Sequence, residues 1–125
     1  MRVEPPRILV IDDDPDLRSM LCGMLSNEGF PVSGAEDGPS ALRLIETEKF
    51  DLLITDVGLP PPMDGFEIVR RARVSTPGLR SLFISGTERA KWDDPQREDF
   101  VYKPFRTSEL VGCIWELFWR DERSL

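Results

Sequence analysis

Residues 50–56 are Phe50-Asp51-Leu52-Leu53-Ile54-Thr55-Asp56, and Val57-Gly58-Leu59-Pro60 follow them directly. The continuous apolar run in this segment predicts a strand that is buried on both faces, as in a parallel sheet. Asp56 ends the run, and in open α/β sheets ligands bind just beyond the carboxyl ends of the strands. An aspartate here either ends a strand and begins a turn or presents a functional carboxylate in a crevice. This segment alone leaves both interpretations open.

Strand-like and helix-like segments alternate along the rest of the chain. Apolar, β-branched runs predict four further strands, at residues 7–11, 31–35, 79–85 and 100–102. Capping residues followed by apolar residues at helical spacing predict helices that begin near Asp14, Asp37, Asp64 and Thr107. Residues 87–99 are polar and show little helical periodicity. The alternation predicts an α/β fold with a doubly wound parallel sheet.

Composition limits the possible functions. A length of 125 residues suits one compact domain, so residues 1–125 are predicted to form a single domain. No apolar run approaches 18 residues and the N-terminus has no apolar signal segment, so we expect a cytoplasmic protein without membrane contact. The net charge of −7 argues against direct nucleic-acid binding. Two cysteines and no histidine exclude a zinc site, a disulfide framework and histidine-dependent nucleophilic catalysis.

Polar side chains follow several of the predicted strands, and the carboxyl ends of those strands meet at one edge of a doubly wound sheet. The residues expected there are Asp12, Asp13, Asp56, Ser85 and Lys103. Crowded carboxylates repel one another unless a cation offsets their charge, and a site with oxygen ligands only selects a hard ion such as Mg²⁺. A metal ion, an ammonium and a hydroxyl around one carboxylate suit a phosphoryl group, with Asp56 as the nucleophile.

These segments resemble the receiver domain of two-component response regulators, in particular the chemotaxis-regulator type. The matching segments are Ile8-Leu9-Val10-Ile11-Asp12-Asp13-Asp14-Pro15, Asp51-Leu52-Leu53-Ile54-Thr55-Asp56 with Leu59-Pro60, Met63-Asp64-Gly65, Leu82-Phe83-Ile84-Ser85-Gly86 and Lys103-Pro104-Phe105. They cover nearly the whole chain in the family's order. The resemblance implies a flavodoxin-like fold with five parallel strands in the order 2-1-3-4-5.

The resemblance also implies roles for individual residues. Asp56 corresponds to the phosphoacceptor, Ser85 to the family's Ser or Thr, and Lys103 to its lysine. Phe100, three residues before Lys103, corresponds to the aromatic residue whose rotation accompanies activation, so Ser85 and Phe100 are the expected switch residues. For Mg²⁺, the resemblance implies Asp13, Asp56 and the backbone carbonyl of Gly58 as direct ligands and Asp12 as a ligand through water.

Two departures from the family pattern affect the expected structure. Two residues, Pro61 and Pro62, separate Leu59-Pro60 from Met63-Asp64-Gly65 where the family usually has one, so the loop after Asp56 is longer and should be stiff. The interval from Ser85 to Lys103 is 18 residues, a few fewer than usual. The family's fourth helix is therefore expected to be short, distorted or missing.

The resemblance implies a function in a two-component phosphorelay. The expected partners are a sensor histidine kinase or phosphotransfer protein and a downstream protein target, and the chain would catalyse only its own phosphorylation and dephosphorylation. Two alternatives remain: a receiver-like interaction module that does not use phosphorylation, and an aspartate-nucleophile phosphohydrolase. The second usually needs an aspartate where Gly58 stands. The initial Met1 favours a complete, stand-alone receiver, whereas the short fourth helix is similar to receivers attached to hybrid kinases.

The last predicted helix carries a second apolar stripe, away from its core side. Val111, Trp115 and Trp119 recur at intervals of four residues. These side chains either cover the exposed edge of the last strand or form a patch for a partner or for self-association. The sequence alone does not decide between these alternatives.

Overall fold

The computed structural model describes residues 4–86 and 99–123, which form a five-stranded parallel sheet in the order β2-β1-β3-β4-β5. The strands are β1 (Ile8–Ile11), β2 (Val32–Ala35), β3 (Leu52–Asp56), β4 (Arg80–Ser85) and β5 (Asp99–Tyr102). The helices are α1 (Pro15–Asn27), α2 (Gly38–Thr47), α3 (Gly65–Ser75) and α4 (Thr107–Arg123). The predicted fold and strand order are confirmed. The predicted shortening or distortion of the family's fourth helix falls on residues 87–98, which lie outside the described residues.

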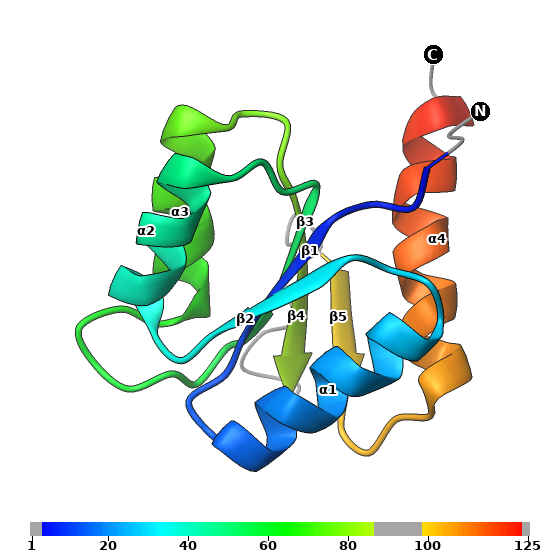
Figure 1. Cartoon of the computed structure of the whole chain (residues 1–125), viewed down its shortest axis with the longest axis horizontal. Helices are drawn as coiled ribbons and strands as arrows, with labels where there is room; N and C mark the ends of the chain where they lie inside the picture. The colour runs from blue at the N-terminus through cyan, green and yellow to red at the C-terminus, as the bar shows by residue number, and fades with distance from the viewer. Residues whose placement is uncertain (1–3, 87–98, 124–125) are drawn as a thin grey trace.

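The helices cover both faces of the sheet, α1 and α4 on one side and α2 and α3 on the other (Figure 1). Residues of the central strands alternate between the two layers: Leu53 packs on the α2/α3 side, whereas Leu52 and Ile54 pack on the α1/α4 side. All three are fully buried, as the apolar run in β3 predicts for a strand covered on both faces.

Three of the four helices begin at the predicted capping residues. The side chains of Asp14, Asp37 and Asp64 accept hydrogen bonds from backbone N–H groups in the first turns of α1, α2 and α3. The prediction for Thr107 is wrong by one residue, because the carbonyl of Arg106 accepts the first helical hydrogen bond of α4, from Leu110. The Glu109 carboxylate accepts a hydrogen bond from the N–H of Arg106, so an acidic side chain in the first turn takes part in capping this helix.

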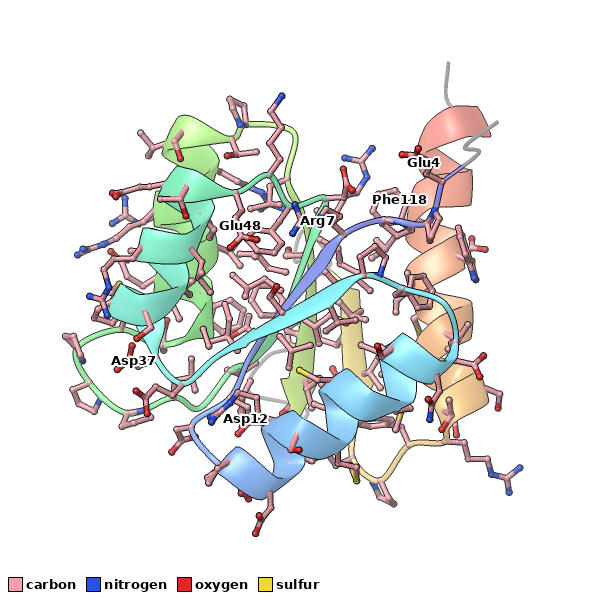
Figure 2. The ribbon with its side chains drawn as sticks, viewed as in Figure 1. Glu4, Arg7, Asp12, Asp37, Glu48 and Phe118 are labelled. Carbon is pink, nitrogen blue, oxygen red and sulfur yellow. The ribbon has the colours of Figure 1, made fainter. Side chains whose placement is uncertain are left out.

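The parallel arrangement places the carboxyl ends of all strands at one edge of the molecule, the lower edge in Figures 1 and 2. Asp12 lies at this edge, whereas Arg7 and Glu48, which form an ion pair, lie near the opposite edge (Figure 2). Within the described residues, no helix is long and apolar enough to cross a bilayer.

Candidate functional site

Three carboxylates lie close together at the carboxyl edge of the sheet. Asp12 and Asp13 directly follow β1, and Asp56 ends β3, the neighbouring strand. One carboxylate oxygen from each residue can be chosen so that all three lie within 4.8 Å of one another. The structure therefore brings together the acidic residues that the sequence places after the two strands.

Asp12 is the most buried of the three, with 2% of its surface exposed. Its Oδ1 accepts a hydrogen bond of 2.9 Å from the N–H of Asp14. Its Oδ2 is buried and has no hydrogen-bond partner among the described residues. Burial raises the pKa of the Asp12 carboxyl above its ordinary value; the hydrogen bond from Asp14 opposes this increase, and the negative charge of Asp56 adds to it. A buried carboxylate oxygen without a donor needs a cation or water beside it.

Asp56 lies between a backbone donor and a cation. Its Oδ1 accepts a hydrogen bond of 2.9 Å from the N–H of Gly58, and its Oδ2 is 3.8 Å from Nζ of Lys103. Lys103 follows β5 directly, and its backbone N–H donates to the carbonyl of Ser85 at the end of β4. The Asp56 carboxylate at the end of β3 thus lies beside the ammonium of Lys103, whose backbone is bonded to the end of β4.

Ser85 and Phe100 occupy different parts of this region. Ser85 is buried, and the strand register places it one residue beyond Ile84, which pairs with Asp56. Phe100 lies two residues before the end of β5, in an aromatic cluster on the α2/α3 side of the sheet, where its ring centroid is 5.4 Å from that of Phe83. The two expected switch residues are therefore both on strands next to the site, but Phe100 is partly buried against the α2/α3 core.

The loop after Asp56 is held by buried apolar side chains on both sides of its exposed prolines. Val57 and Leu59 flank the exposed Gly58 and are buried in the α2/α3 core, as is Met63. Residues 60–62 are all exposed prolines, so the extra residue of this loop lies in solvent. Gly58 is therefore fixed from both sides next to Asp56, whereas the additional proline is exposed.

Two residues that the sequence analysis did not single out support the site. Arg18 in α1 donates a hydrogen bond of 2.8 Å from Nη1 to the carbonyl oxygen of Asp12. Gly65, at the start of α3, lies so close to β3 that a Cβ atom there would be 2.6 Å from the carbonyl oxygen of Asp56. Gly65 belongs to the quoted Met63-Asp64-Gly65 motif, which was the only sequence signal for its role. Arg18 carries no comparable signal, because arginine side chains in helices mostly lie in solvent.

Comparison with known proteins identifies the family. The model of the response regulator receiver domain matches residues 8–114. The chain belongs to the response regulator receiver family. The receiver protein CpdR of Brucella abortus is 37% identical over 112 residues, which cover 86% of this chain and 92% of CpdR. The response regulator MprA of Mycolicibacterium vanbaalenii is 37% identical over 120 residues, covering 93% of this chain but 52% of MprA. The receiver thus spans nearly all of one relative and about half of the other.

Solved structures with the same fold include a chemotaxis protein and a response regulator in complex with Mg²⁺. Chemotaxis protein CheY4 of Vibrio cholerae has a TM-score of 0.79 and 27% identity, over 90% of this receiver and 98% of CheY4. TrrA of Thermotoga maritima, solved in complex with Mg²⁺ and BeF, has a TM-score of 0.78 and 28% identity, over 89% of this receiver and 97% of TrrA. These likenesses confirm the predicted family and its place in two-component phosphorelay signalling, and they do not favour the alternative of a phosphorylation-independent module.

Proposed function

We propose that Asp56 is the phosphoacceptor of this receiver. The observation that carries the proposal is the position of its carboxylate, 3.8 Å from Nζ of Lys103 and within 4.8 Å of two further carboxylates. A carboxylate that is half-buried at a strand end, with a cation on one side and acidic metal ligands on the other, suits the transfer of a phosphoryl group.

The proposed donor is the phosphohistidine of a sensor kinase or phosphotransfer protein. A carboxylate oxygen of Asp56 forms a bond to phosphorus, the phosphorus–nitrogen bond breaks, and the leaving imidazole takes up a proton. The product is an aspartyl phosphate. The ammonium group of Lys103 is the proposed partner of one phosphoryl oxygen, and the hydroxyl of Ser85 is the proposed hydrogen-bond donor to a second.

The acidic cluster fits Mg²⁺. Its side-chain donors are carboxylate oxygens only, and the buried Oδ2 of Asp12 has no donor among the described residues. Asp13, Asp56 and the carbonyl of Gly58 would hold the ion directly, and Asp12 would hold it through water. When bound, Mg²⁺ offsets charge on the transferring phosphoryl group. The Mg²⁺–BeF complex of TrrA supports this assignment by similarity.

The remaining parts of the proposal follow from the family. The receiver acts in the cytoplasm as a single domain of residues 1–125, and it catalyses only its own phosphorylation and dephosphorylation. Its output is a changed surface for a downstream protein, with Ser85 and Phe100 as switch residues. An aspartate-nucleophile phosphohydrolase is not favoured, because Gly58 stands two residues after Asp56 and cannot act as a general acid.

Self-association through α4 is a second, separable part of the proposal. Trp115 is 43% exposed, although its ring centroid is 5.4 Å from that of buried Phe30, so part of the ring remains available for a partner. The side chain of Trp119 is not among those described. Sedimentation of Trp115→Ala, with and without beryllofluoride, tests this part: weaker association at unchanged thermal stability supports it, and unchanged association contradicts it.

The phosphoacceptor is tested by labelling with acetyl phosphate in the presence of Mg²⁺. Asp56→Asn should abolish labelling, and removal of Mg²⁺ by a chelator should do the same to the wild type. Asp16→Asn is a matched control, because Asp16 is an exposed carboxylate in the first turn of α1 and lies outside the cluster. Labelling of Asp56→Asn at the wild-type level would exclude Asp56 as the acceptor.

A further inference from the structure

The first turn of α3 packs directly against the backbone of the proposed phosphoacceptor. Gly65 is buried, and a Cβ atom there would lie 2.6 Å from the carbonyl oxygen of Asp56 and 3.2 Å from the side chain of Thr55. The N–H of Gly65 also donates a hydrogen bond of 3.2 Å to the carbonyl of Val57. Because the two backbones touch without an intervening side chain, a shift of the chain at residues 56–57 must move the start of α3 as well.

The next residue, Phe66, extends this contact to β5. Its ring centroid is 4.7 Å from that of Phe83 in β4 and 6.2 Å from that of Phe100 in β5. Phe83 and Phe100 are themselves 5.4 Å apart, and Phe100 stacks on Tyr102 at 5.8 Å. These separations are typical of favourable aromatic pairs, so the position of each ring limits the positions of its neighbours.

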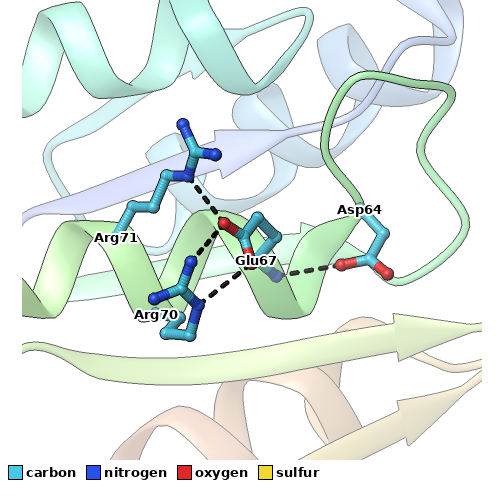
Figure 3. A network of polar contacts seen from close by, with 4 residues as sticks. All are labelled: Asp64, Glu67, Arg70 and Arg71. Carbon is cyan, nitrogen blue, oxygen red and sulfur yellow. Dashed lines mark hydrogen bonds and ion pairs between the residues drawn. The ribbon is translucent and has the colours of Figure 1, made fainter.

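The outer side of the same helix turn is a polar surface. Glu67 accepts hydrogen bonds from Arg70 and Arg71, and its backbone N–H donates to the side chain of Asp64 (Figure 3). These four residues, with Pro62 and Phe66, line a hollow of about 440 Å³. Phe66 therefore belongs both to the aromatic cluster inside and to a surface hollow outside, and displacement of its ring would alter that surface.

We propose that the first turn of α3 is a mechanical link between Asp56 and Phe100, with Gly65 and Phe66 as its positioning residues. This inference rests on the proposed function, since it requires a phosphoryl group at Asp56. A change at Asp56 passes through the tight contact at Gly65 to the ring of Phe66 and from there to Phe83 and Phe100. The link runs along the α2/α3 side of the sheet. Through it, phosphorylation of Asp56 changes the polar surface drawn in Figure 3.

The test uses beryllofluoride with Mg²⁺ as the phosphoryl analogue and the variant Phe66→Leu, which keeps an apolar side chain but removes the aromatic contacts. Coupling between two sites is reciprocal, so a residue that transmits the change must also affect analogue binding. Phe66→Leu should change the affinity for beryllofluoride on the order of fivefold, with Mg²⁺ affinity unchanged. It should also reduce the analogue-induced change in amide hydrogen exchange in β5, and Phe66→Tyr should restore both.

Val74→Ala is the matched control, because Val74 is on the same helix and is 80% exposed. If Phe66 has only a structural role, Phe66→Leu will have a lower melting temperature, but its analogue affinity and its β5 response will equal those of the wild type. That result overturns the link. Gly65→Ala gives an independent measurement, with an expected loss of analogue affinity. If the wild type itself does not bind beryllofluoride, the proposed function is overturned. If the wild type binds it and Phe66→Leu responds as the wild type does, only the link is overturned.

Discussion

The loops that follow Asp56 and Lys103 are anchored in different core layers and to different extents. The loop after Asp56 is held on the α2/α3 side by Val57, Leu59 and Met63, which are all buried. The loop after Lys103 is held on the α1/α4 side by the ring of Phe105, which is only partly buried. The distance between the Asp56 carboxylate and Nζ of Lys103 therefore depends on packing in both core layers. Of the two loops, the one after Lys103 is the less firmly held.

Among the substitutions next to the site, Met63→Ala should lower the free energy of unfolding most, because it removes an anchor of the loop after Asp56. Met63 is 6% exposed, and truncation of a buried methionine should lower the free energy of unfolding by about 2 to 3 kcal/mol. Released from Met63, Gly58 should hold Mg²⁺ less well, so the rise in melting temperature with added Mg²⁺ should be smaller than in the wild type.

Leu25→Ala separates loop anchoring from general stability. Leu25 is fully buried in the α1/α4 layer, so its truncation should destabilise the protein at least as much as Met63→Ala. It should leave the Mg²⁺-dependent rise intact. An equal loss of that rise in both variants would mean that the loop after Asp56 is not specifically anchored by Met63.

Phe105→Ala tests the weaker anchor. Because Phe105 is only partly buried, we expect a loss of about 1 to 2 kcal/mol in the free energy of unfolding. The acidic cluster does not include this loop, so Mg²⁺ binding should be unchanged. The rate of labelling by acetyl phosphate should fall, since Lys103 would be held less firmly beside Asp56. Loss of Mg²⁺ binding with an unchanged labelling rate would contradict the division between the two loops.

Asp12→Asn should change the free energy of unfolding less than the substitutions above, and it should raise this free energy where they lower it. The buried Oδ2 of Asp12 has no partner among the described residues, and its negative charge lies beside those of Asp13 and Asp56. Removal of that charge should raise the free energy of unfolding of the Mg²⁺-free protein by about 1 kcal/mol. The additional stability from Mg²⁺ should shrink. Thermal unfolding with and without a chelator measures the stability of the Mg²⁺-free protein and the gain from Mg²⁺. A less stable Mg²⁺-free variant would count against repulsion among the three carboxylates.

The fold and the acidic cluster could be predicted because they depend on local patterns. Apolar runs such as Leu52-Leu53-Ile54 define buried strands, and residues that follow parallel strands must meet at one edge. The difference between buried Asp12 and exposed Asp13 was not predictable, because it depends on tertiary contacts such as the hydrogen bonds of the Asp12 backbone with Ala35 in β2 and Arg18 in α1. The anchoring of Met63 against Gly38 in α2 likewise depends on tertiary packing, although the motif itself was recognised.

Other misses have a more local cause. Thr107 was predicted as a cap because its hydroxyl is a favoured acceptor, but α4 begins one residue earlier in the hydrogen-bond pattern, with Glu109 bonded to the N–H of Arg106. Competition between two capping arrangements is decided by the orientation of the incoming loop, which a single sequence does not give. The hydrogen bond from Arg18 to the Asp12 carbonyl likewise depends on the path of the loop between β1 and α1, which a single sequence does not give.

The smallest expected effect is the pH-dependent contribution of Glu67, on the solvent side of α3, to the free energy of unfolding. Hydrogen bonds from Arg70 and Arg71 lower the pKa of the Glu67 carboxyl from 4.5 to about 2 (Figure 3). Because the folded-state pKa is the lower one, the carboxylate contributes stability above pH 4.5 and loses it as the pH falls from 4.5 towards 2. Both arginine side chains are more than half exposed, so solvent and salt screen the contribution.

Thermal unfolding of the wild type and Glu67→Gln across this pH interval isolates the Glu67 contribution, since the other carboxyls titrate in both proteins. The wild type should be slightly more stable above pH 4.5, the difference should vanish towards pH 2, and added salt should reduce it. Because α3 faces the α2/α3 core with its other side, Mg²⁺ binding should not change in this variant. A stability difference that is independent of pH would show that Glu67 acts through packing and not through its ion pairs with the two arginines.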